Sequence, residues 1–158
     1  MDWFVKAFIR ASLAWFAAGV SLGLAMAIHP AWVVYRTAHL HMSLLGFVSM
    51  MIFGVAYHVI PRLSGQPLRT PRLAVAHWWL ANLGLATFVV GLVLLPNTMF
   101  AAPARAVVAV GGLLSAAGAY TFVYNLWRTI GPRRKQLAAS LGGAEAPSVV
   151  TLRRAAGR

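Results

Sequence analysis

The residues most able to do chemistry in this sequence are its five histidines, two of which lie inside a long apolar stretch. His39 and His41 sit within a run that is apolar from about residue 32 to residue 60. Asp2 and Glu145 are the only acidic residues, so no carboxylate lies near the pair in sequence to act as a general base or to complete a nucleophilic triad. Because ionisable side chains inside apolar spans are costly and functional by default, the pair indicates a bound cofactor.

The spacing of the pair predicts two separate binding sites. Residues two apart on an α-helix are rotated by about 200°, so His39 and His41 point to nearly opposite faces and cannot bind one metal ion together. His39 shares its face with Gly46, whose missing side chain would leave room for a flat macrocycle. Larger apolar residues share the face of His41 and suit packing against such a ring. The alternative is that both are hydrogen-bonded packing residues.

The composition predicts that membrane helices hold these residues. Apolar residues make up 60% of the 158 residues and charged residues only 10%, which is too little charge to cover a surface facing water. Four apolar runs are long enough to span a bilayer, which takes about 20 helical residues. We expect an all-α fold, an integral membrane four-helix bundle in residues 1–131, followed by a basic cytoplasmic tail at 132–158. The four helices are expected at about 4–28, 32–60, 73–95 and 104–130.

The distribution of lysine and arginine predicts the orientation of these helices. The net charge is +12, and all but two of the 14 basic residues lie at the amino end, in the middle loop or in the tail region. Only Arg36 and Arg105 lie in the two opposite loops, so the positive-inside rule puts both termini in the cytoplasm. The expected partners of the basic residues are anionic lipid headgroups and not nucleic acid. The chain has no cysteine, which excludes disulfides, iron–sulfur clusters and covalently attached haem.

Three motifs follow one another along the chain. They are a His-x-His pair with a glycine after it, a Pro-Arg-Leu turn and a His-Trp-Trp-Leu motif, at His39, His41, Gly46, Pro61-Arg62-Leu63 and His77-Trp78-Trp79-Leu80. In order and spacing, over about residues 35 to 92, they resemble the late helices of haem–copper oxidase subunit I, nearest to the nitric oxide reductases and C-type oxidases. This resemblance implies that His39 binds the iron of a high-spin haem and His41 that of a low-spin haem, with haem b as the cofactor.

The same resemblance also limits the expected activity. The related enzymes have many more helices and a second metal centre with three further histidines, which one four-helix chain cannot supply. Reduction of oxygen or nitric oxide is therefore not expected unless oligomerisation builds a new site, and copper is not expected as a cofactor. The resemblance implies a haem protein of the bacterial inner membrane in electron transfer or haem-linked redox chemistry, with an unknown redox partner. The alternatives are a sensor or assembly factor that binds haem, a gas or copper without turnover, and a structural subunit with vestigial histidines.

Other residues are expected near the haem or at the membrane surface. Arg36 lies three residues before His39 on the same face, so we expect it to pair with haem propionates, with Arg105 as the second candidate. His58 and His77 are a lesser candidate for a second metal or haem site, although interfacial side chains that reach the headgroups explain them more simply. Six aromatic residues are expected in the interfacial belts: Trp32, Tyr35, Tyr57, Trp78, Trp79 and Trp127.

The opposed histidines also predict an oligomer. Each of the two needs a partner histidine from elsewhere, and a head-to-tail ring supplies it if His39 of one protomer and His41 of the next bind one haem between them. The pseudo-threefold symmetry of the related subunit suggests a homotrimer with up to three haems. The alternative is a twofold dimer that pairs His41 with its symmetry mate.

Overall fold

The computed structural model describes residues 2–131, and all regular structure in this range is helical. The three uninterrupted helices are α1 (Trp3–Ile28), α4 (Pro71–Leu94) and α5 (Ala101–Ile130). The remaining membrane-length segment, Pro30–Leu63, consists of η1 (Pro30–Tyr35), α2 (Arg36–His41), η2 (Met42–Ser49) and α3 (Met50–Leu63). The all-α prediction with four long helices is therefore confirmed, while the predicted basic tail lies outside the described residues.

All four segments are long and apolar enough to cross a membrane, which supports a multi-pass membrane protein. Little of their surface is covered within one chain, since only 11% of the most apolar part of α1 and of α5 is buried. Large apolar side chains such as Leu24, Leu113 and Val123 are more than half exposed. A surface of this kind suits lipid or another apolar partner and not water. The location of the two termini remains a prediction.

The second segment is not the single regular helix that the sequence predicts. It opens as the 3-10 helix η1 with Pro30 at its first position, and it changes directly after His41 into the π-helix η2. Ser49 supports this wider turn by donating its hydroxyl hydrogen to the carbonyl of Leu44, at 2.9 Å. The helix also continues past the predicted stop at Pro61 as far as Leu63. π-Turns are rare and are frequent at functional sites, and this one begins at the residue after the histidine pair.

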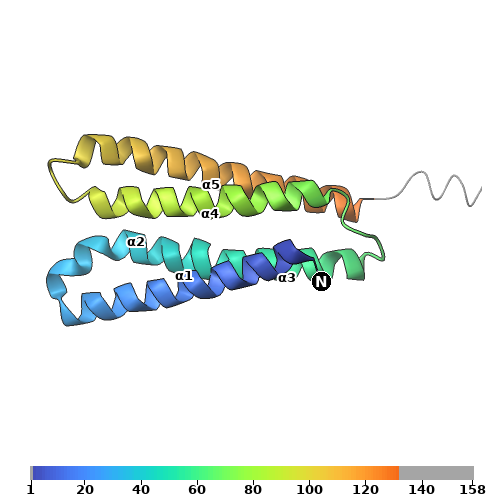
Figure 1. Ribbon diagram of the computed structural model, residues 1–158, viewed down its shortest axis with the longest axis horizontal. Coiled ribbons are helices and arrows are strands. Elements are labelled where there is room, and N and C mark those ends of the chain that lie inside the picture. The colour runs from blue at the N-terminus through green and yellow to red at the C-terminus, as the bar shows by residue number, and fades with distance from the viewer. Residues whose placement is uncertain (1, 132–158) are drawn as a thin grey trace, which may run out of the picture.

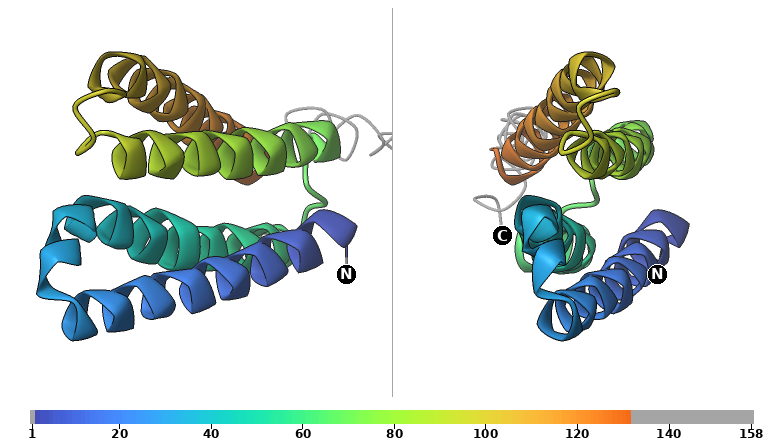
Figure 2. Two further views of the ribbon diagram at one scale, coloured as in Figure 1. Left: turned by 60° about the vertical axis from the view of Figure 1, so that its left-hand side comes forward. Right: turned by 90° about the vertical axis from the view of Figure 1, so that its left-hand side faces the viewer.

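The chain folds into two antiparallel helix pairs, as Figures 1 and 2 show. In one pair α1 packs along the second segment, and in the other α4 packs along α5. Glycines permit the close approach of α4 and α5. A Cβ atom on Gly84 would lie 2.6 Å from the backbone nitrogen of Ser115, and one on Gly91 would lie 2.8 Å from that of Val108. Small residues at such contacts are typical of membrane helices, which have little other means of packing closely.

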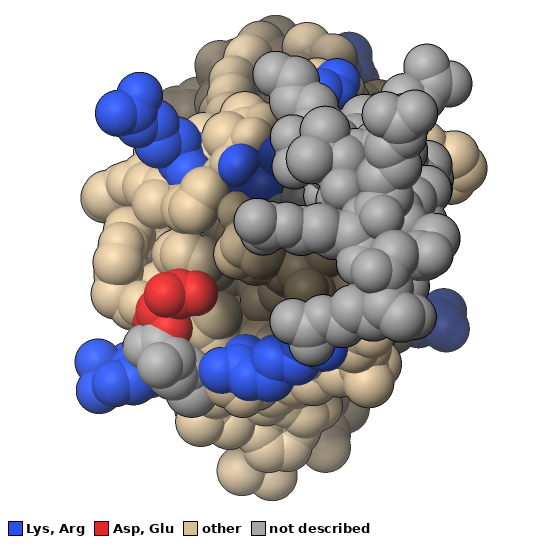
Figure 3. Space-filling model, turned by 90° about the vertical axis from the view of Figure 1, so that its right-hand side faces the viewer, with Lys and Arg blue, Asp and Glu red and all other residues tan. Residues whose placement is uncertain are grey.

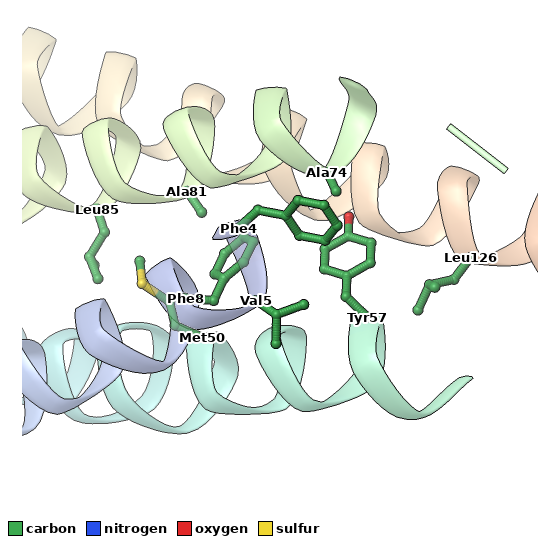
Figure 4. Packing of buried hydrophobic residues seen from close by; sticks show 9 residues of the cluster. All are labelled: Phe4, Val5, Phe8, Met50, Tyr57, Ala74, Ala81, Leu85 and Leu126. Atoms are coloured by element: carbon green, nitrogen blue, oxygen red, sulfur yellow. The ribbon is translucent and has the colours of Figure 1, made fainter. Parts of the chain in front are cut away.

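The apolar core lies where the two pairs meet, toward the end of the molecule that holds the amino terminus (Figure 4). Its buried residues are Phe4, Val5, Phe8, Met50, Tyr57, Ala74, Ala81, Leu85 and Leu126. Tyr57 is only 2% exposed, so the prediction that it belongs to an interfacial belt is wrong. Its side chain turns inward because it packs against the rings of Phe4 and Phe8 from α1. Trp32, Trp79 and Trp127 are exposed, which agrees with the interfacial interpretation.

The two ends of the bundle differ in charge. The end that holds the amino terminus is ringed by lysine and arginine side chains, with the carboxylate of Asp2 among them (Figure 3). The described basic residues near this end are Lys6, Arg10, Arg62, Arg69, Arg72 and Arg128. Arg36 and Arg105 belong to the opposite end, where α2 and α5 begin. The charge asymmetry predicted from the sequence is thus present among the described residues.

Candidate cofactor-binding site

His39 lies in α2 and is held against α1. Its Nδ1 atom is 2.9 Å from the carbonyl oxygen of Gly19, and the ring is half-buried. Gly23, one turn further along α1, makes room for the ring, since a Cβ atom there would lie 3.0 Å from Cε1 of His39. Gly19 and Gly23, four residues apart, therefore form the face of α1 on which this histidine rests.

His41 points the other way, toward α4. Its Nδ1 atom is 2.8 Å from the carbonyl oxygen of Thr37 in the same helix. Its ring is half-buried and packs on Phe88 of α4, with ring centroids 4.7 Å apart. The two histidines thus contact elements on opposite sides of the second segment, as the 200° rotation predicts.

The two hydrogen bonds place a hydrogen on Nδ1 of both rings. A carbonyl oxygen can only accept, so Nδ1 of each ring must carry the hydrogen and donate it. A neutral imidazole in this tautomer has its free lone pair on Nε2, which is the atom that binds metals. A backbone carbonyl bonded to Nδ1 is also the usual outer support of a metal-binding histidine, because it fixes ring orientation and raises ligand basicity. In the neutral state, both rings would therefore present Nε2 as the possible metal-binding atom.

Gly46 makes a helix contact within the chain. A Cβ atom on it would lie 2.6 Å from Cβ of Trp15 and 3.1 Å from a methyl carbon of Leu85. Side chains of α1 and α4 thus occupy the space that the absent side chain leaves, and no macrocycle fits there inside one protomer. The role of Gly46 as a haem contact remains a prediction, and the structure gives it a packing role.

The apolar surface near the two histidines is open on the outside of the chain. Leu40, Leu44, Leu45 and Val48 are all at least 39% exposed. This apolar surface lies beside the two histidine rings, which themselves rest on α1 and α4.

The two arginines predicted to bind propionates lie at the same end of the bundle. Arg36 is the first residue of α2, and Arg105 lies in the second turn of α5. Both side chains are exposed. Only Arg36 is on the same short helix as His39, so it is the better placed of the two to reach a carboxylate of a ligand bound there.

The structure does not bring His58 and His77 together. Arg62 contacts His58, with its Nη1 atom 2.9 Å from Nδ1 of the ring. His77 is 0% exposed and bonds Tyr57 instead, so the prediction that it is an interfacial side chain is wrong. Across residues 2–131 no group of three or more histidine, aspartate or glutamate side chains is placed to hold a metal ion. His29 is exposed, and its ring lies tilted beside that of Trp32 with the ring centroids 5.7 Å apart.

Sequence reasoning missed the hydrogen bond between Tyr57 and His77. The two residues lie on different helices, and no sequence pattern around either residue predicts a contact with the other. A usable signal was present in α4, because Ala74 and Ala81 stand three residues before and four residues after His77 and are both buried. Small residues at that spacing mark a helix face that packs closely, and His77 shares this face.

Comparison with known proteins places the chain beside subunits of respiratory oxidases. Residues 4–142 match the family model of cytochrome c and quinol oxidase polypeptide I. The chain is 25% identical over 151 residues to a Cbb3-type cytochrome c oxidase subunit CcoN1 of Stutzerimonas stutzeri, with 78% of this chain and 32% of the relative covered. It is 30% identical over 132 residues to a cytochrome c oxidase subunit 1 of Rhodobacter capsulatus, with 68% of this chain and 25% of the relative covered. The chain thus spans between a quarter and a third of the length of these relatives.

Proposed function

The chain belongs to the cytochrome c and quinol oxidase polypeptide I family, and from this premise we propose that it binds haem b through His39 and His41 and takes part in electron transfer. The observation that carries the proposal is the pair of Nδ1 hydrogen bonds to backbone carbonyls, at 2.9 and 2.8 Å. They leave Nε2 of both rings free to ligate iron. Because the relatives are bacterial oxidase subunits, the proposed location is the bacterial inner membrane.

The proposal stops short of the relatives' oxidase activity. The chain spans no more than about a third of their length, and the described residues hold no cluster of three metal-binding side chains. Bound haem would supply one-electron chemistry. Within the chain, the carbonyls of Gly19 and Thr37 orient the two ligands, and the apolar side chains around them keep water from the metal. The second candidate is a haem-linked gas sensor, which would leave one axial position of the iron open.

We further propose that each haem lies between two copies of this chain. His39 and His41 contact opposite sides of the second segment, so they cannot meet on one iron within a protomer. The space beside Gly46 is filled by Trp15, and the apolar surface near the histidines faces outward. A closed ring in which His39 of one protomer and His41 of the next share a haem satisfies all three observations. Three copies are proposed, with a twofold dimer as the alternative.

The function is tested by counting haem in the purified protein. Protein made in haem-supplied cells and extracted in mild detergent is analysed by a pyridine haemochrome assay against its protein concentration. We expect haem b at one per protomer, the ratio that the ring requires. Protein that remains without haem after both expression and direct addition of haem contradicts the proposal. A five-coordinate haem that binds carbon monoxide directly favours the gas sensor.

The ring predicts a definite mass. Native mass spectrometry of the haem-loaded protein should give a trimer that carries three haems, and removal of haem should shift the population toward smaller species because each haem bridges two chains. A dimer with one haem supports the twofold alternative. A monomer that retains haem is incompatible with either arrangement.

Substitution of Arg36 by leucine tests its predicted role at the propionates. Loss of an exposed ion pair should weaken haem retention by up to about fivefold, measured by transfer of haem to apomyoglobin. Arg72→Leu, at the opposite end of the bundle, is the matched control and should retain haem like the wild type. Equal transfer rates for all three proteins would make Arg36 an ordinary loop charge.

Gly23 provides a test of how His39 is positioned. Gly23→Leu should push the ring away from α1, because even a Cβ atom would lie 3.0 Å from Cε1, and it should lower haem occupancy by about tenfold or more, as loss of an outer-shell support does. Ala27→Leu adds the same side chain on an exposed position of α1 and should leave occupancy unchanged. The two variants are compared by haem absorbance per protein at matched helix content. Full occupancy in Gly23→Leu would show that the α1 contact does not position the ligand.

A further inference from the structure

His77 is fully buried, and it lines a cavity. The side chain is 0% exposed and lies among the rings of Phe8, Phe53 and Phe122. Within residues 2–131 its Nε2 atom has no hydrogen-bond partner. A buried polar atom without a hydrogen bond destabilises the fold, so we expect a hydrogen-bonding group beside this nitrogen.

The cavity beside His77 has a volume of about 50 Å³ and lies between η2, α3, α4 and α5. Ser115 lines it, and the hydroxyl of this residue is the second buried atom there that lacks a partner in the described part of the chain. Ser49 lines the same cavity, and its oxygen can still accept a hydrogen bond. A water molecule needs roughly 10–15 Å³ of such volume and two or more polar partners, so the cavity has the size and the chemistry to hold a few water molecules.

The other ring nitrogen of His77 leads to the surface. Its Nδ1 atom is 3.1 Å from the hydroxyl oxygen of Tyr57, whose side chain projects from α3 toward α4 (Figure 4). Tyr57 in turn lines an open groove of about 370 Å³ together with Asp2, Arg62 and Gln66. This groove lies at the basic end of the bundle, since Asp2 near the amino terminus and Arg62 both line it. Two hydrogen-bonded side chains thus connect the open groove with a partly open, largely apolar cavity whose polar lining residues are Ser49, His77 and Ser115.

We propose that the cavity beside His77 binds water and that Tyr57 and His77 pass protons between it and the groove. In the forward direction the Tyr57 oxygen takes a proton from a hydronium ion in the groove, which becomes neutral water, as its own hydroxyl proton moves to Nδ1 of His77. The Nε2 hydrogen of the same ring moves at once to water in the cavity, so one proton advances and no side chain keeps a charge. The same steps in reverse return the proton to the groove and restore the first tautomer, so the pair exchanges protons reversibly between the two sites, and no electron is transferred.

The path does not depend on haem, so it stands apart from the proposed function. It leads from the basic end toward the level of His41, because Leu45, four residues after that histidine, lines the cavity. Leu85 lines it as well and lies three residues before Phe88, on which the His41 ring packs. Protons delivered to this cavity would arrive close to the side of the second segment that His41 occupies.

The test is hydrogen–deuterium exchange at the His77 ring, followed by NMR of haem-free protein with labelled histidine. The signal is assigned by its loss in His77→Asn. In the wild type we expect a cross-peak between the ring N–H and water, and exchange that is fast for a fully buried group. Tyr57→Phe removes the only hydroxyl in the connection and should slow this exchange at least about tenfold. Tyr120→Phe, at an exposed tyrosine of α5, is the matched control and should exchange like the wild type.

A second variant tests the cavity without touching the hydrogen-bonded pair. Ala81→Val adds two methyl groups to a residue that lines the cavity and should remove the water cross-peak while the Tyr57–His77 bond persists. Exchange at the same rate in Tyr57→Phe as in the wild type would overturn the proton path. A wild-type ring N–H that lacks a water cross-peak and resists exchange for hours would overturn both the water site and the path. If Tyr57→Phe does not fold, the Ala81→Val result decides.

Discussion

His41→Ala is expected to remove haem from the protein almost completely. The ring nitrogen Nε2 of His41 is presented by a hydrogen bond from Nδ1 to the carbonyl of Thr37, and no other described side chain near Phe88 could replace it as a ligand. Occupancy should fall well beyond the roughly tenfold to hundredfold loss typical of an outer-shell change. His39→Ala should act equally, because in a ring each haem needs both residues. The measurement is haem absorbance per protomer after purification.

The matched control for both substitutions is His58→Ala. His58 lies on the same helical segment, but its ring is engaged by Arg62 at the basic end. Its removal should leave occupancy and spectrum unchanged. If His39→Ala and His41→Ala retained six-coordinate haem while His58→Ala lost it, the site would have to be reassigned.

Gly111→Ala is expected to have the largest effect on stability. A Cβ atom there would lie 2.6 Å from Cα of Phe88 and would also meet its backbone nitrogen, so α4 and α5 would have to separate. Overpacking of this kind costs about 1–3 kcal/mol and outweighs the gain of about 1 kcal/mol that alanine brings over glycine inside a helix. We therefore expect a lower midpoint of thermal unfolding in detergent. Because Phe88 also packs on His41, haem occupancy should fall as well.

The neighbouring glycine supplies the control. A Cβ atom on Gly112 would make only ordinary contacts, at 3.4 and 3.7 Å, with ring carbons of Phe88. Gly112→Ala should therefore be neutral or slightly stabilising, because only the helix propensity changes. Equal effects of the two substitutions would show that helix propensity, and not the contact between α4 and α5, sets the stability.

The features that the sequence predicts correctly follow from local geometry. The four helices follow from apolar length, since each run of about 20 residues must form its own backbone hydrogen bonds in lipid. The opposed directions of His39 and His41 follow from the rotation of one helix and needed no knowledge of their neighbours. The family follows from three motifs in order, and the match over residues 4–142 confirms it.

The features that the sequence does not reveal depend on contacts between helices. The π-helix after His41 cannot be read from Met42–Ser49, because these residues are equally compatible with an α-helix. From the sequence, the missing side chain of Gly46 suggests room for a macrocycle. In the structure the side chain of Trp15, 31 positions earlier, fills this room. The same holds for Tyr57, which belongs to the interfacial belt by residue type but is buried by packing against α1.

Optical spectroscopy of the wild-type protein tests the central claim most directly. Protein purified in detergent from haem-supplied cells is measured oxidised and again after reduction with dithionite. We predict a Soret band and, on reduction, the sharp α-band of a six-coordinate b-type haem with two histidine ligands. A colourless protein that also fails to take up added haem would contradict the assignment of His39 and His41 as haem ligands.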